Sequence, residues 1–318
     1  MRRALIIGIN KYEHVGCLGG CINDANNVKK VLERHSNNED KEKNFDIDLI
    51  TEDKNPITRK SLKDRIRELF RDKREVSLLY FSGHGYIESS GGYLITSECK
   101  DGDDGISMND ILTMVNESPA NNKIVILDCC HAGGFGTDTL NKGMASIKEG
   151  VTIMAASASN QYSIEKNGSG VFTKLLIHAL EGGAASILGD ITPGNVYGYI
   201  DKAMGSKGQR PIFMTNVRRY TNLRKVPSQI GAKQLKELTN LFKNPNEEFK
   251  LDPSFEPESE NPNEDNCKKF AILQKYNRVN LLIPVDAPHM YHAAMASKSC
   301  KLTNQGKSYW EMVKNNII

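Results

Sequence analysis

Six short segments rich in apolar and β-branched residues alternate with helical patterns, and several of them are apolar nearly throughout. The six segments are 4–9 (ALIIGI), 45–51 (FDIDLIT), 76–83 (VSLLYFSG), 123–128 (KIVILD), 151–158 (VTIMAASA) and 210–215 (RPIFMT). Strands with apolar residues at successive positions are typical of a parallel sheet that is covered on both faces. The pattern therefore predicts six strands, most of them parallel and central.

Five amphipathic helical patterns lie among these strands, at 23–35, 58–72, 107–118, 170–183 and 192–205. Their starts carry residues typical of helix caps, such as Thr58 and Ser107, and Pro193 stands in a first turn. Strands that alternate with helices in this way indicate an α/β fold. We predict a three-layer sandwich with a mostly parallel six-stranded sheet over residues 1–222.

The composition changes after residue 222. Segment 244–266 has four prolines and eight acidic residues against one lysine, and such a segment is poorly suited to forming a core. We therefore interpret 223–266 as a helix followed by an acidic, proline-rich linker. Residues 267–318 regain apolar content and include Trp310, the one tryptophan. They predict a small C-terminal module with a faint resemblance to part of a winged helix.

Charge and cysteine content limit the class of protein. The net charge of +3 and the pI near 8.3 argue neither for nor against nucleic acid, since a dedicated binder usually shows a dense basic patch. No apolar run reaches the roughly 18 residues that span a bilayer, and the N-terminal apolar run is too short for a secretory signal. Seven cysteines at irregular spacing indicate reduced thiols. We expect a cytoplasmic protein with no membrane or nucleic-acid partner.

A histidine and a cysteine follow two of the predicted strands. His84 lies between two glycines after segment 76–83, and Cys130 comes directly after Cys129 beyond segment 123–128. The carboxyl ends of parallel strands meet at one edge of a sheet, so His84 and Cys130 are expected there together. An imidazole beside a thiol is the usual arrangement for a cysteine nucleophile.

A metal site is the alternative reading of this region. Cys17 and Cys21, together with Cys129, Cys130 and His131, would supply enough ligands for zinc. The C-x2-C pairs of structural zinc sites are absent, so the spacing favours the Cys–His pair over a metal.

The motifs around these two residues resemble the caspase-like cysteine peptidases, and most closely bacterial metacaspase-like proteins. YFSGHG and LDCCHAGG carry the resemblance, together with the N-terminal segment up to the Cys-x-Asn-Asp tetrad that ends at Asp24. MAASASNQYSIE and GVFTKLLIHAL are similar to the start of the family's small subunit. The resemblance implies a caspase-like sandwich with a large-subunit-like part (1–136), a processing loop (137–150) and a small-subunit-like part (151–222).

The resemblance also implies catalytic roles. His84 would be the base and Cys130 the nucleophile. The backbone N–H groups of Gly85 and Cys130 would form the oxyanion hole. Lys142 and Lys148, in the processing loop, are the candidate self-processing sites.

Three further residues match positions that line the family's S1 pocket, namely Asp24, Ser82 and Asp128. Two carboxylates favour a basic P1 side chain, so cleavage after Arg or Lys is implied, and not after Asp. Many metacaspases use calcium, but Met108 and Asn109 occupy the positions of the usual aspartate pair. Asp101, Asp103 and Asp104 are only weak calcium candidates, and no cofactor is expected.

These features predict a cysteine endopeptidase that acts on protein substrates. By analogy it would serve in bacterial stress response or antiphage cell death, and a partner protein would activate it through the C-terminal module. The alternative is a non-enzymatic adaptor that keeps the fold for protein–protein interaction. Such adaptors typically lose the cysteine or the histidine, and both are present here.

Overall fold

The computed structural model describes residues 1–36, 42–52, 56–89, 91–130, 146–156, 168–205, 210–217, 219 and 221–318. Two compact units divide the chain. The first comprises residues 1–186 and 190–227, and the second comprises 187–189 and 228–318. Each unit is described by itself below.

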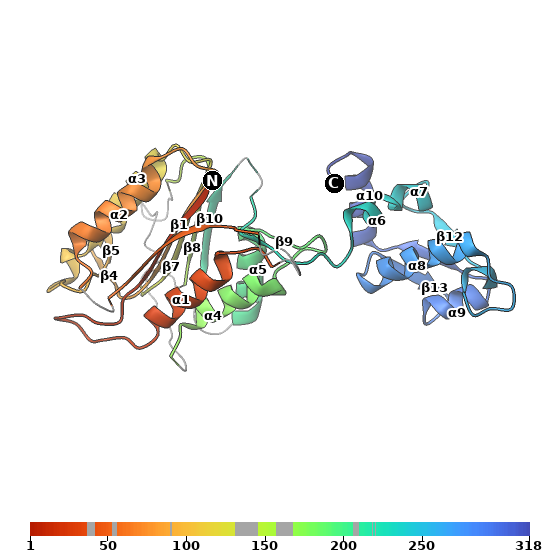
Figure 1. Cartoon of the computed structure of the whole chain (residues 1–318), viewed down its shortest axis with the longest axis horizontal. Helices are drawn as coiled ribbons and strands as arrows, with labels where there is room; N and C mark the ends of the chain where they lie inside the picture. Colours follow the sequence, from red (N-terminus) through yellow and green to blue (C-terminus); the bar gives the residue numbers. More distant parts are fainter. Residues whose placement is uncertain are drawn as a thin grey trace. The chain divides into compact units, whose positions relative to one another are not determined.

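The first unit is built on a six-stranded sheet with the order β10-β8-β7-β3-β1-β2 (Figure 1). Its strands are β1 (Arg2–Gly8), β2 (Asp46–Thr51), β3 (Val76–Ser82), β7 (Asn122–Asp128), β8 (Val151–Ala155) and β10 (Ile212–Asn216). All neighbouring pairs are parallel except β10 with β8. Each strand falls on one of the six predicted segments, so the predicted sheet is confirmed.

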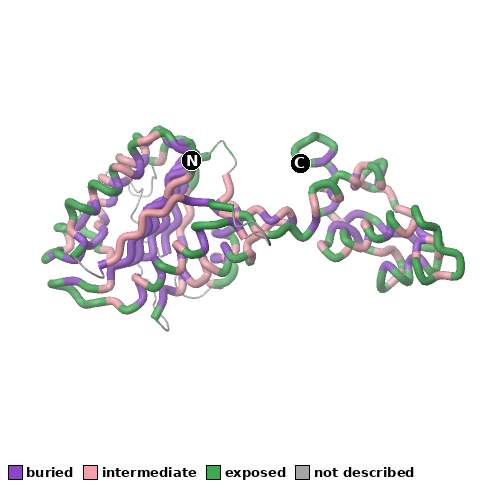
Figure 2. The backbone as a smooth tube through the Cα atoms, viewed as in Figure 1, coloured by how far each residue is buried: buried purple, intermediate pink, exposed green. Residues whose placement is uncertain are grey.

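Helices cover both faces of this sheet, which makes the predicted three-layer sandwich. Helices α2 (Arg59–Arg71) and α3 (Met108–Glu117) pack on one face, and α1 (Cys21–Leu32), α4 (Val171–His178) and α5 (Pro193–Met204) pack on the other. Alternate residues of β1 face opposite layers: Leu5 and Ile7 contact the first, Ala4 and Ile6 the second. Figure 2 shows the central strands as a continuous buried block.

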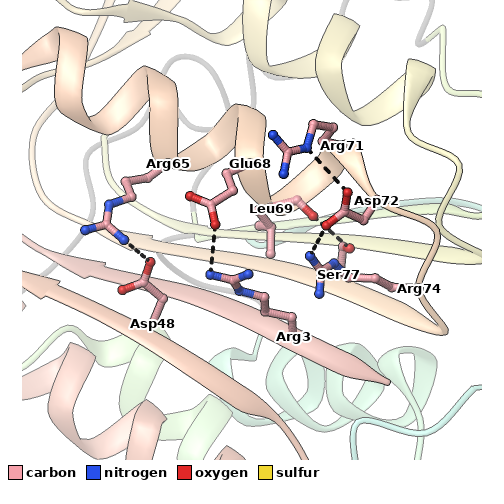
Figure 3. Close-up of polar contacts among 9 residues, drawn as sticks. All are labelled: Arg3, Asp48, Arg65, Glu68, Leu69, Arg71, Asp72, Arg74 and Ser77. Atoms are coloured by element: carbon pink, nitrogen blue, oxygen red, sulfur yellow. Dashed lines mark hydrogen bonds and ion pairs between the residues drawn. The ribbon is translucent and has the colours of Figure 1, made fainter.

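Ion pairs join α2 to the sheet. Arg65 contacts Asp48 of β2 at 3.0 Å, and Arg3 of β1 contacts Glu68 at 3.4 Å (Figure 3). These side chains are partly exposed, so each pair contributes at most about 1 kcal/mol. The apolar side of α2, which is buried against the sheet, supplies more of the stability.

A small antiparallel sheet follows β3 directly, and the sequence pattern did not predict it. Its strands are β4 (Gly85–Glu88), β5 (Gly91–Leu94) and β6 (Ile106–Ser107). They are short, and β4 is largely exposed, so neither length nor alternation marks them as strands. The two-residue strands β9 (Asp190–Ile191) and β11 (Arg224–Lys225) pair with each other, and a π-helical turn (Ala179–Gly183) continues α4.

The second unit has a core of its own, and here the linker interpretation is wrong. Its elements are α6 (Ala232–Lys236), α7 (Leu238–Leu241), β12 (Glu248–Lys250), α8 (Glu264–Arg278), β13 (Leu282–Val285), α9 (Met290–Met295), β14 (Ser299–Leu302) and α10 (Asn304–Lys314). Leu251 and Phe255, from the expected linker, are buried in the same core as Trp310. The indole N–H of Trp310 donates to the carbonyl of Phe242 at 2.8 Å. Segment 228–266 is therefore an integral part of this unit.

Within the described residues, no helix has the length and apolar content that crossing a bilayer requires.

Candidate active site

The ends of β3 and β7 set the geometry of the site. The two strands are parallel neighbours, and their last residues, Ser82 and Asp128, are paired in register. The N–H of Gly83 donates to the carbonyl of Asp128 at 3.4 Å. His84 and Cys130 each lie two residues beyond this pair, so the register places them at the same edge of the sheet.

The backbone after His84 lies against the backbone of Cys130. A Cβ atom built on Gly85 would be 2.1 Å from the carbonyl oxygen of Cys130 and 3.1 Å from Sγ of Cys129. Only a residue without a side chain allows β4 to start this close to the end of β7.

For the cysteine peptidase activity that the sequence predicts, Gly85→Ala should lower kcat/KM by about 10²-fold, because Cys130 must move and an ångström-scale displacement at a reacting group has that effect. Gly92→Ala, in the adjacent strand, is the matched control. The three atoms nearest to its Cβ would all belong to the flexible side chain of Met108, so its kcat/KM should fall by less than about fivefold. Equal losses in the two variants would contradict the proposed closeness of Gly85 to the reacting atoms.

The imidazole of His84 is held by the loop that follows β1. Its Nε2 lies 2.6 Å from the carbonyl oxygen of Gly16. A carbonyl oxygen only accepts, so Nε2 carries the proton and Nδ1 is the basic nitrogen. The ring of Tyr12 contacts the imidazole with centroids 4.7 Å apart, and its hydroxyl accepts the backbone N–H of His84 at 2.8 Å.

A buried carboxylate anchors this loop. Glu52, at the end of β2, is 7% exposed. Its oxygens accept the N–H of Asn10 at 2.8 and 2.9 Å, and that of Lys11 at 2.6 Å. The Asn10 carbonyl in turn accepts the N–H of Leu18 at 2.8 Å. Glu52 thus positions the backbone that holds His84, a role that the sequence analysis missed.

A pocket of about 70 Å³ adjoins both reactive side chains. It gathers the five side chains that were assigned to catalysis and to S1: His84, Cys130, Asp24, Ser82 and Asp128. Its other described walls are Leu18, Cys21, Gly83 and Gly170.

Two carboxylates converge in this pocket from different elements. Asp24 lies in the first turn of α1, and Asp128 ends β7. A Cβ built on Gly170 would be 2.2 Å from Oδ2 of Asp128 and 3.3 Å from Oδ2 of Asp24, so the carboxylates lie within a few ångströms of each other. Asp24 accepts the hydroxyl of Ser169 and, at 2.9 Å, the N–H of Gly170.

A chain of two hydroxyl groups, with Thr173 as its last member, leads to Asp128. Thr173 of α4 donates to its Oδ2 at 2.7 Å, and the Tyr80 hydroxyl lies 2.6 Å from Oγ1 of Thr173. Burial raises the pKa of Tyr80 well above its usual value, and the nearby carboxylates Asp128 and Asp24 add to this effect. Tyr80 therefore keeps its proton and donates it to Thr173, whose own proton goes to Asp128.

Cys129 differs from Cys130. It is 1% exposed, whereas Cys130 is partly exposed. Burial raises the pKa of the Cys129 thiol well above its usual value, and the neighbouring Asp128 adds to the shift. A protonated, buried thiol is a poor nucleophile and a poor metal ligand. His131 lies outside the described residues, among which no group of three or more His, Cys, Asp or Glu side chains is arranged to hold a metal.

The weak calcium candidates form a capped turn. Asp101 precedes the 3₁₀ turn Gly102–Asp104, and the side chain of each of Asp101 and Asp104 accepts from the other's backbone. Asp103 lies in the same turn. This arrangement accounts for Asp101 and Asp104 as turn-forming residues, and a calcium site here stays a weak prediction.

The two self-processing candidates differ in their setting. Lys142 lies outside the described residues. Lys148 is exposed just before β8, but its backbone is engaged: its N–H donates to Oδ1 of Asn116 at 2.8 Å, and its carbonyl accepts from Val151 at 3.3 Å. Cleavage after Lys148 would require these bonds to open.

Comparisons with known proteins agree with this architecture. A family model described as "Caspase domain" matches residues 1–256. Metacaspase-1B of Neurospora crassa is 36% identical over 89 residues, which are 26% of this chain and 20% of that protein. Metacaspase-1 of Lodderomyces elongisporus is 31% identical over 153 residues, 42% of this chain and 33% of that protein. The chain thus matches no more than a third of the length of these curated relatives.

Two solved structures share the fold. Protein GSU0716 from Geobacter sulfurreducens superimposes with a TM-score of 0.53 at 17% identity and covers 71% of this chain and 97% of its own. Caspase-1 from Spodoptera frugiperda gives 0.52 at 13% identity, with 72% and 91% covered. At these identities the likeness concerns the fold alone, and it confirms the predicted caspase-like sandwich.

Proposed function

Because this chain belongs to the caspase domain family, we propose that it is a cysteine endopeptidase whose reactive pair is Cys130 and His84. The observation behind the proposal is that one pocket is lined both by this pair and by two carboxylates, Asp24 and Asp128. A thiol and an imidazole supply nucleophile and base, and the carboxylates supply a reason for substrate selection.

The proposed reaction begins with a proton transfer. His84 takes the thiol proton of Cys130 on Nδ1 while the Gly16 carbonyl holds Nε2–H. The thiolate attacks the scissile carbonyl carbon, and the backbone N–H groups of Gly85 and Cys130 stabilise the resulting oxyanion. The imidazolium then gives its proton to the leaving amine. Water, activated by the neutral imidazole, hydrolyses the thioester and frees Cys130.

The pair Asp24 and Asp128 favours a basic P1 residue. Two neighbouring buried carboxylates repel each other, and a guanidinium or ammonium group between them would offset that repulsion. An aspartate side chain would add a third negative charge to the pocket, so we propose cleavage after Arg or Lys, with Ser82 as part of the same wall.

The test is hydrolysis of three matched fluorogenic peptides that differ only in the P1 residue: Arg, citrulline and Asp. Citrulline has nearly the shape of arginine without the charge. We expect kcat/KM to be at least about 10²-fold higher for Arg than for citrulline, and no turnover of the Asp peptide. Running each assay with calcium and with a chelator also tests the calcium requirement. Preferential cleavage after Asp would overturn the proposed specificity.

Several expectations beyond the reaction remain predictions. They are self-cleavage after Lys142 or Lys148, activation by a partner protein through the C-terminal residues, and a role in stress response or cell death. The adaptor alternative predicts that none of the three peptides is hydrolysed.

A further inference from the structure

A second and larger cavity lies on another part of the first unit. It has a volume of about 420 Å³ and follows the groove between α1 and α4. Figure 1 shows these two helices side by side on the same face of the sheet. A volume of several hundred Å³ is typical of small-molecule sites, and neither Cys130 nor His84 lines this cavity.

The two ends of the groove differ in chemistry. At one end Asn23 and Ser169 line the cavity, and the Asn23 amide donates to the carbonyl of Gly168 at 3.3 Å, so both helices begin there. Asn27 follows one turn later. The Asn27 amide donates to Oδ1 of Asn23 at 3.3 Å, and the Ser169 hydroxyl donates to Asp24. A side-chain amide has two N–H groups and an oxygen, so this end still presents neutral donors and acceptors to a ligand.

The other end is basic. Lys30 of α1 and Arg224 of β11 line it, and Lys174 of α4 lies between the two ends. At this end the two cations Lys30 and Arg224 outnumber the carboxylate of Glu181, the acidic residue of the described lining. The cavity therefore favours a ligand with negative charge at this end.

Hydrogen bonds to the backbone hold the guanidinium of Arg224 in a fixed position. Its Nε donates to the carbonyl of Arg34 at 3.0 Å, and its Nη1 donates to the carbonyl of Leu180 at 2.8 Å. Burial lowers the pKa of this guanidinium, and Glu181 counteracts the shift. An anion bound beside Arg224 would also offset the cost of burying its charge, and a preorganised guanidinium is well suited to phosphate.

We propose that the groove between α1 and α4 binds a nucleotide, with its phosphates at Lys30 and Arg224 and its base at the amides of Asn23 and Asn27. Seven residues of helix separate Asn23 from Lys30, a rise of about 10 Å, which suits the length of a nucleoside diphosphate. Asparagine amides can pair with the donors and acceptors on the edge of a base.

The groove shares a wall with the smaller pocket. Ser169 lines the groove and donates its hydroxyl to Asp24, while the next residue, Gly170, lines the pocket that holds Cys130. A ligand in the groove would therefore contact the segment that positions an S1 carboxylate. The binding site itself does not depend on the proposed peptidase activity.

Calorimetric titration of the full chain with ADP, GDP and pyrophosphate, at low ionic strength, tests this proposal. We expect ADP or GDP to bind with one site per chain and at least about tenfold more tightly than pyrophosphate. Lys30→Glu should weaken nucleotide binding by at least about tenfold, because it places a negative charge beside the phosphates. Lys30 is exposed, so this variant should fold.

Lys29→Glu is the matched control, since it makes the same charge change on the neighbouring residue of α1, outside the described lining. It should alter the affinity by less than about threefold. The proposal is overturned by no detectable binding of either nucleotide at about 1 mM, by equal weakening in the two variants, or by pyrophosphate that binds as tightly as the nucleotides.

Discussion

Replacing Cys130 by alanine is expected to lower kcat/KM for the Arg peptide by at least about 10⁴-fold, which is the scale of loss when a covalent nucleophile is removed. Cys130 is partly exposed in a pocket that His84 also lines. Among the described residues of this pocket, no other offers an exposed thiol to the imidazole. The same variant should keep its full intact mass on storage, whereas a wild-type chain that cleaves itself would not.

Cys129→Ala is the matched control for this result. It removes the adjacent thiol, which is buried and protonated, and leaves the pocket side chains in place. We expect less than about tenfold loss of kcat/KM, together with a small loss of stability from the cavity that it leaves. Alkylation by iodoacetamide should likewise label Cys130 and spare Cys129. Full activity in Cys130→Ala, with loss in Cys129→Ala, would reverse the assignment.

Asp128→Asn is expected to remove most of the preference for a charged P1 residue. The substitution keeps the size of the side chain and deletes one of the two neighbouring charges in the pocket. Loss of one partner from a buried charge interaction commonly costs about 2–5 kcal/mol, so kcat/KM for Arg should fall by about 30- to 5,000-fold. The value for citrulline should change far less, and the Arg/citrulline ratio is the quantity to measure.

Thr173→Val separates this effect from a structural one. It deletes the hydroxyl that donates to Asp128 but keeps both carboxylates, and Ser82 remains as a hydrogen-bond partner for Tyr80. The free energy of unfolding should fall by about 1–3 kcal/mol. The ratio of kcat/KM for the Arg and citrulline peptides should stay within about tenfold of the wild-type ratio. An Asp128→Asn enzyme that keeps the wild-type ratio would rule out Asp128 as the selecting charge.

Most strands of the main sheet could be predicted because they are apolar along nearly their whole length. Segment 76–83, for example, has no polar face to confuse it with an amphipathic helix, and β3 is buried at every position. The hairpin that starts at Gly85 has no such signal, because its strands are short and partly exposed. The acidic composition of segment 244–266 led to its interpretation as a linker. Acidic residues surround Leu251 and Phe255, yet these two residues are buried in the core of the second unit.

The sequence predicts only those parts of the site that are made of side chains. The ends of two central strands placed His84 and Cys130 at one edge, and the family resemblance added Asp24 and Asp128. The group that holds the imidazole is a backbone carbonyl. Every residue type has one, so the sequence does not indicate this contact. Glu52 is similar, because its role depends on the N–H groups of a loop about forty positions earlier in the chain, and sequence spacing does not reveal that contact.

The carbonyl of Gly16 has a consequence for how this protein can change in evolution. A Cβ atom at this position would meet nothing within 4 Å, so most residue types can be accommodated there, and each of them brings the same carbonyl oxygen. Point mutations at position 16 therefore keep the carbonyl oxygen that accepts from His84. We expect such mutations to leave the activity unchanged. Selection falls instead on Glu52 and Tyr12, which keep the loop in place, so a survey of natural variants should find position 16 diverse and those two positions nearly fixed.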